Sequence, residues 1–149
     1  MKEVIDGIVT ALTANAAFKT AVSYVDADDP GFYFGRAPDG VIANRSEYVV
    51  IHLIANMHGE TFADYLEDML IQFTMRSNRS STTGDGGGVS IEDLRIALWN
   101  ALDEVTLTID GYSQALMLRQ NTVGPEWDDD ANLWFLSTDY RIIATKTHS

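Results

Sequence analysis

The chain has 149 residues, 46% of them hydrophobic and 21% charged, which is the composition of a packed domain rather than of a disordered chain. It contains no cysteine, which excludes disulfide frameworks, thiolate metal sites and cysteine nucleophiles. The net charge of −12 disfavours binding to nucleic-acid phosphates. No run approaches the ~18 apolar residues of a membrane span, and Asp6 and Gly7 interrupt the first apolar stretch. We therefore expect no membrane partner, no signal peptide and synthesis in the cytoplasm.

The first part of the sequence predicts one helix and two strands. Apolar residues recur at three- and four-residue spacing from Val4 to Val22, which is typical of an amphipathic helix. A turn at Pro30-Gly31 precedes the short aromatic strand Phe32–Phe34. After a second turn at Pro38–Gly40, the apolar and β-branched segment Glu47–Ala55 predicts a strand covered on both faces. We expect the helix to cover one face and a neighbouring subunit to cover the other.

The middle of the sequence predicts a strand, a polar loop and a second helix. Met69–Arg76 has a period of two and predicts a strand with one buried face, whereas the structure of the preceding Asn56–Glu67 is left open. Ser77–Gly88 holds no apolar side chain, so we expect a flexible Gly/Ser-rich loop at about 77–89. Ser90 is predicted to cap the second helix. The predicted buried stripe of this helix is Ile91, Leu94, Leu98, Leu102 and Val105.

The last part of the sequence predicts three strands. They are Thr106–Ile109, Ser113–Val123 and Asn132–Lys146, with a turn at Asp110-Gly111 and a loop at Gly124-Pro125. Because the last segment exceeds a typical strand, we expect a bulge or bend in it. The order of elements predicts the α+β class, with a largely antiparallel β-sheet and two main helices packed on one face. We expect a single domain spanning residues 1–149.

No motif in the sequence predicts catalysis, a bound metal or a cofactor. The acidic segment Asp26–Gly31 has the glycine of a calcium loop at its sixth position, but Pro30 and Ala37 occupy two ligand positions. Gly84-x-Gly86 lacks the third glycine of a dinucleotide-binding turn. The histidines stand in unrelated contexts, and His52 is predicted to be a hydrogen-bonded strand residue rather than a base. We therefore expect a protein that is not an enzyme and has no cofactor.

Large apolar side chains that lie outside the buried stripes predict a protein interface. On the second helix, Ile96 lies nearly opposite the buried stripe, and Trp99 lies off the stripe toward the same side. Trp127 stands in an acidic loop, where a large aromatic side chain either binds a partner or folds back onto its own domain. Ile96, Trp99 and Trp127 are therefore the candidate oligomer-interface residues.

A further pattern lies in the order of segments along nearly the whole chain. The segments are the Ala-rich helix end Leu12–Val22, Phe34–Pro38 before a polar turn, Glu47–Val50, Met69–Arg76, the second helix, Leu107–Gly111, Leu116–Arg119, an acidic turn and the closing Asp139–Ala144. This order resembles the small tail-terminator or tail-completion proteins of long-tailed bacteriophages. The sequence departs from the family pattern in a longer Asn56–Glu67 segment and in its Gly-rich loop.

The resemblance implies a virion structural protein at the head-proximal end of the tail. Such a protein would form a closed ring of six subunits that ends tail-tube polymerisation and offers a docking surface to the head connector and neck proteins. DNA would pass through the ring without specific binding, and Asp85, Asp128, Asp129 and Asp130 are candidate acidic residues of its lumen or rim. The alternatives are a head–tail connector or neck adaptor and a monomeric small adaptor or binding module, because a fold alone does not determine function.

Overall fold

The strand-forming segments of the sequence pair into a five-stranded sheet with the order β1-β2-β3-β5-β4. The computed structural model describes residues 2–60, 64–78, 87–103 and 105–147. Neighbouring strands are antiparallel except that β1 runs parallel to β2, which confirms the predicted α+β class and its largely antiparallel sheet. The strands are β1 (Phe32–Phe34), β2 (Glu47–Glu60), β3 (Asp64–Ser77), β4 (Gln114–Asp128) and β5 (Leu133–Thr147).

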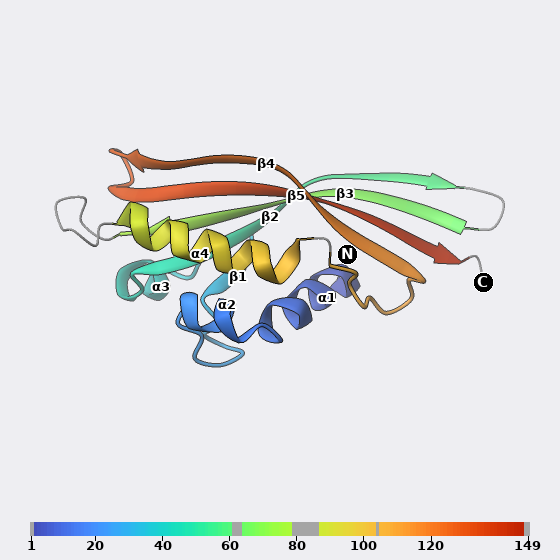
Figure 1. Cartoon of the computed structure of the whole chain (residues 1–149), viewed down its shortest axis with the longest axis horizontal. Coiled ribbons are helices and arrows are strands. Elements are labelled where there is room, and N and C mark those ends of the chain that lie inside the picture. The colour runs from blue at the N-terminus through green and yellow to red at the C-terminus, as the bar shows by residue number, and fades with distance from the viewer. Residues whose placement is uncertain (1, 61–63, 79–86, 104, 148–149) are drawn as a thin grey trace.

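Three helices pack on one face of the sheet and bury much of it (Figure 1). They are α1 (Lys2–Thr13), α2 (Ala16–Ala21) and α4 (Gly87–Leu102). Alternate strand residues point toward these helices and form one core with their apolar stripes, as a period of two in the strands requires. The stripe predicted for α4 is confirmed for four residues, all of them buried: Ile91, Leu94, Leu98 and Leu102. The fifth predicted member, Val105, is half-buried and lies beyond the end of the helix.

The helix predicted from Val4 to Val22 is two helices, because the chain turns at Ala14 and Asn15. The Oδ1 atom of Asn15 accepts a hydrogen bond from the backbone N–H of Phe18 at 2.9 Å and so caps α2. Asparagine favours this position over a helix interior because its side chain competes for backbone hydrogen bonds. The turn keeps Phe18 buried, with its ring centroid 5.9 Å from that of Phe32.

Two other helix boundaries differ from the prediction. The expected turn at Pro38–Gly40 is the start of α3 (Asp39–Asn44), with Pro38 as its N-cap. α4 begins at Gly87, ahead of Ser90, so Ser90 lies within the helix and the predicted cap is wrong. Packing of the apolar stripe of α4 against the sheet outweighs the low helix propensity of the glycines at its start.

The segment Asn56–Glu67, which the sequence left open, belongs to a β-hairpin. β2 continues to Glu60 and β3 begins at Asp64. The predicted strands Glu47–Ala55 and Met69–Arg76 are confirmed as parts of these two longer strands. The backbone pairing of β2 with β3 therefore extends beyond the segments whose side chains alternate between buried and exposed.

The C-terminal strands differ from the prediction in where they bend. Thr106–Ile109 is not a strand in the described part of the chain and forms a single bridge, between Thr106 and Leu116. β4 does not stop at Gly124-Pro125 but runs through it. The bulge expected in β5 lies in β4, where the register with β5 shifts between Arg119 and Thr122 and again between Val123 and Glu126. β5 pairs with neighbours on both sides, whereas β4 is an edge strand, where bulges are common.

The strands are about twice as long as the helices that cover them. β3 and β4 have 14 and 15 residues and span about 46–50 Å at ~3.3 Å per residue. α4 has 16 residues and spans about 24 Å at ~1.5 Å per residue. The hairpin of β2 and β3, together with the end of β5, therefore projects beyond the helices (Figure 1).

The guanidinium group of Arg45 joins the start of β2 to the end of α2. The Arg45 side chain is only 10% exposed, and it donates to Asp29 Oδ1 through Nη2 at 2.7 Å and Nε at 2.9 Å. It also donates to the backbone oxygens of Asp29, Val22 and Ser23 at 3.0, 2.6 and 3.1 Å. The last two oxygens are carbonyls that the end of α2 leaves free. Arg45, followed by the Tyr33 hydroxyl at 2.9 Å, holds the pKa of Asp29 below its usual value.

We expect Arg45→Lys to lower the free energy of unfolding by about 2 kcal/mol, because an ammonium group cannot replace these fork-like bonds and leaves buried carbonyls unsatisfied. Arg36→Lys is the matched control, since Arg36 pairs with Asp39 at 2.9 Å but its side chain is 80% exposed. That change should cost less than about 0.5 kcal/mol. Urea unfolding of both variants measures the difference, and equal losses would contradict a structural role for Arg45.

Candidate assembly interface

The outer edge of β2 carries exposed apolar side chains. In the ladder with β3, Leu53 pairs with Ile71 and Ala55 pairs with Leu70, so Ile54 forms a bulge. Leu53 and Ile54 are exposed, and Met57, further along the projecting hairpin, is 65% exposed. Exposed apolar residues grouped on a sheet edge are typical of a surface that binds another molecule, which makes this edge a candidate interface.

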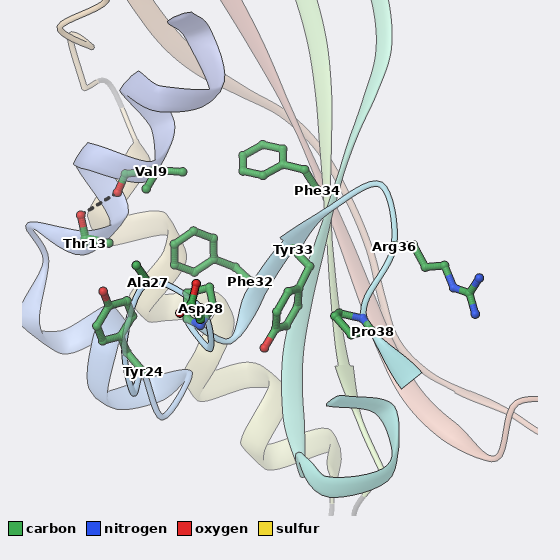
Figure 2. Close-up of a pocket in the computed structure, with 11 residues that line it drawn as sticks. Val9, Thr13, Tyr24, Ala27, Asp28, Phe32, Tyr33, Phe34, Arg36 and Pro38 are labelled. Carbon is green, nitrogen blue, oxygen red and sulfur yellow. Dashed lines mark hydrogen bonds between the residues drawn. The ribbon is translucent and has the colours of Figure 1, made fainter. Parts of the chain in front are cut away.

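An apolar cleft lies beside this edge, between α1 and β1 (Figure 2). Its volume is about 340 Å³. Tyr24, Phe32 and Phe34 line it with aromatic rings, while the Arg36 side chain points away from the other labelled residues (Figure 2). A second cleft of about 300 Å³ shares Phe34 and continues to Leu53. The two clefts and the exposed part of β2 therefore form one continuous apolar edge.

Three of the polar side chains that line the larger cleft, those of Thr13, Tyr33 and Arg36, are already engaged within the protein. The Thr13 hydroxyl donates to the backbone oxygen of Val9 at 2.8 Å (Figure 2). The Tyr33 hydroxyl donates to Asp29, and Arg36 pairs with Asp39. A small-molecule site needs a few polar groups directed at the ligand. The cleft is better suited to apolar side chains of another protein.

The helix-free face of the sheet is apolar near the hairpin and polar at its centre. Its apolar residues near the hairpin are Leu66, Leu70, Leu116, Leu118 and Ile143. Among them, Arg141 donates to Asp68 at 2.6 and 2.8 Å, and this contact holds the pKa of Asp68 below its usual value. At the centre, Gln72 donates to Asp139 at 3.2 Å. At the other end of the sheet, Val41 of α3 packs against Tyr48 and Val50 in a small second core.

The structure places the two predicted interface residues of α4 in different environments. Ile96 is 48% exposed. Trp99 is half-buried, and its indole N–H donates to the Thr138 hydroxyl at 3.3 Å. The guanidinium groups of Arg95 and Arg119 lie 4.1 and 3.4 Å from the centroid of its ring. Trp99 therefore packs within its own domain, and Ile96 is the side chain of the two that a partner can reach.

The acidic turn between β4 and β5 is organised by its own side chains. Trp127 is half-buried against Trp134, with ring centroids 5.7 Å apart, and its indole N–H donates to Asp129 at 2.8 Å. Asp128 accepts hydrogen bonds from the backbone N–H groups of Asp130 and Ala131 at 3.0 and 3.2 Å. Asp129 and Asp130 remain exposed. The other predicted acidic residue of the rim, Asp85, lies outside the described residues. The role of the acidic turn in a lumen or rim stays a prediction.

The described side chains do not assemble a metal site. In residues 2–60, 64–78, 87–103 and 105–147, no group of three His, Asp or Glu side chains is placed to hold a metal ion. The Asp26 carboxylate accepts from the backbone N–H groups of Asp28 and Asp29, both at 2.9 Å, and so shapes its own turn. The predicted hydrogen bond of His52 is confirmed, because its Nε2 donates to Gly35 O at 2.8 Å. None of the described helices has the length and apolar character needed to cross a membrane.

The sequence predicted a second covered face for the strand Glu47–Ala55, but Leu53, Ile54 and Met57 were not named as candidate interface residues. The signal was present, because Val49–Ile51 and Leu53-Ile54 are apolar without alternation, interrupted by His52 alone, and Met57 follows them. A strand covered by helices on one face needs only every second residue to be apolar. The excess apolar residues indicated a second covered surface.

Comparison with known proteins identifies a shared fold. A chain in the solved structure of the virion of a native gene transfer agent (GTA) particle matches this chain with a TM-score of 0.58 at 14% sequence identity. The alignment covers 93% of this chain and 91% of that chain, so the similarity extends over the whole fold. The sequence matches no protein-family model and no curated protein.

We expect Trp99→Ala to lower the free energy of unfolding by about 2–4 kcal/mol, because it removes a half-buried ring together with its hydrogen bond and two cation–π contacts. Ile96→Ser should change it by less than about 0.5 kcal/mol, since the side chain is exposed in the single chain. Chemical unfolding at a concentration where the protein is monomeric separates the two effects. A large loss from Ile96→Ser under these conditions would contradict its assignment as a surface residue.

Proposed function

We propose that this chain is a virion structural protein that forms a ring at the head-proximal end of a phage tail. The ring ends polymerisation of the tail tube and presents the surface that joins tail to head. The observation that carries the proposal is the match of nearly the whole fold to a chain of a phage-like particle, the GTA virion. The order of segments in the sequence, which resembles tail-terminator proteins, supports the same conclusion independently.

The distribution of exposed apolar residues supports an assembled protein. The β2 edge combines two apolar clefts with the exposed side chains of Leu53, Ile54 and Met57. In a monomer this apolar surface stays in contact with water, whereas a subunit of a ring buries it on assembly. The proposed partners are therefore further copies of this chain, the tail-tube protein and the proteins of the head connector.

The acidic character of the chain suits a channel through which DNA moves. With a net charge of −12, the protein repels phosphate groups and gives DNA no attractive surface on which to stop. The exposed carboxylates of Asp129 and Asp130 lie at one end of the sheet and are the described candidates for the rim of the channel. DNA is thus a passing molecule and not a ligand.

A head–tail connector or neck adaptor is the second candidate function. It fits the same fold and the same exposed edge, because one fold can serve different functions. A monomeric adaptor with a ligand pocket has less support, because the Thr13, Tyr33 and Arg36 side chains of the larger cleft are engaged in internal contacts.

Light scattering after size exclusion, with images of the particles, tests the ring directly. We expect a mass close to six times the 16.5 kDa of the single chain and ring-shaped particles. Because the proposed contacts are apolar, the assembly should persist at high salt, where exposed ion pairs are screened. A mass of a single chain at every protein and salt concentration would contradict the ring and favour the adaptor.

A further inference from the structure

Exposed large apolar side chains lie along both outer edges of the sheet. On one edge are Leu53, Ile54 and Met57 of β2. On the other edge are Val123 of β4 and Ile96 of α4. α4 is held beside β4 through Trp99, which binds Thr138 of β5, and the Thr138 hydroxyl lies 3.1 Å from that of Thr122 of β4. One contact between the two edges would therefore cover both groups.

The two edges differ in how they are protected. β1 pairs with β2 only at Val49–Ile51, and beyond this segment the outer side of β2 has no strand partner among the described residues. β4 carries two bulges and Pro125, features that limit backbone pairing of an edge strand, so a second copy that meets β4 does so mainly through side chains. The unprotected, apolar edge is thus that of β2, and it needs a cover.

The directions of the strands favour a second copy of the chain as that cover. β2, β3, β5 and β4 alternate in direction, so the two edge strands β2 and β4 run opposite to each other. A rotation that places β2 of one copy beside β4 of the next makes them antiparallel. Such a contact uses two different surfaces and can repeat until a ring closes. A two-fold contact of β2 with β2 would leave Ile96 and Val123 exposed.

The positions of the two groups along the sheet are compatible with closure. On β5, the residue level with Leu53 is Tyr140, and the partner of Val123 is Ser137. To bring Val123 of one copy level with Leu53 of the next, the second copy must move along the strands by about 10 Å, at ~3.3 Å per residue. To bring Val123 level with Met57, which lies level with Ile143 of β5, the movement is about 20 Å. The four strands β2, β3, β5 and β4 give each copy a width of about 19 Å, at ~4.8 Å per strand. A shift of this size over that width tilts the strands by roughly 30–45° from the axis of the ring. Sheets close into barrels at a similar tilt of about 35–45°.

We propose that neighbouring copies meet edge to edge, with Leu53, Ile54 and Met57 of one copy packed against Ile96 and Val123 of the next. The contact rests on the ring function proposed above and specifies which surfaces close the ring. It also gives Ile96, which the single chain leaves exposed, an apolar environment.

Cross-linking tests this contact cleanly because the chain contains no cysteine. The variants are Ile54→Cys, Val123→Cys and, as a control, Thr20→Cys on the exposed surface of α2. Each is purified, mixed in pairs, treated with a short bismaleimide and analysed on a denaturing gel. We expect the Ile54→Cys and Val123→Cys mixture to give a covalent dimer at least tenfold more abundant than either variant alone or either mixed with Thr20→Cys. The double variant I54C/V123C should give a ladder of oligomers.

Other results would overturn the contact. Efficient coupling of Ile54→Cys to itself would show a two-fold β2–β2 contact. Rings of the unlinked variants in light scattering, without coupling between positions 54 and 123, would reject the edge contact and leave the ring function standing. Single chains in light scattering and no coupling would reject both.

Discussion

The difference in length between strands and helices is the constraint on which the arrangement of this protein depends. Strands of 14 and 15 residues extend about twice as far as α4, so the helices can bury only part of one sheet face. The rest of the sheet must be covered by loops, by a partner or by water. The projecting hairpin follows directly from this difference (Figure 1), whereas the free side of β2 follows from the short length of β1, which pairs with β2 only at Val49–Ile51. An assembling subunit gains an interface from surface that its own core does not need.

Within the covered half, the chain fixes the sheet firmly to its helices. The Tyr140 hydroxyl donates to Asp103, just past α4, at 2.6 Å, and burial followed by this bond raises the pKa of Tyr140 well above its usual value. Asp103 also lies 3.6 Å from Arg119, which stacks on Trp99. At the other end, Arg45 holds the end of α2 against the start of β2. These contacts join the helices to the sheet at both ends of the covered half.

Sequence periodicity predicted the elements whose side chains face one common core. The stripe of α4 and the strands around Met69–Arg76 and Glu47–Ala55 followed from spacing alone, because one buried face imposes a period. The break at Asn15, the start of α4 at Gly87 and the hairpin extension were missed, since capping, tertiary packing and backbone pairing set them without changing that period. For the candidate interface, the exposure of Ile96 was predicted because this residue opposes a buried stripe. Trp99 was assigned to the same surface because spacing does not show that two arginines and Thr138 surround its ring.

The most direct test of the account is a cryo-EM map of the virion that contains this chain, at a resolution that traces the strands. We expect a closed ring of copies between the tail tube and the head connector, in which the β2 side of each copy lies against the β4 side of the next and the exposed carboxylates of Asp129 and Asp130 lie near the channel. Density for the chain elsewhere in the particle would contradict the proposed function. A ring joined through other surfaces would contradict the edge contact alone.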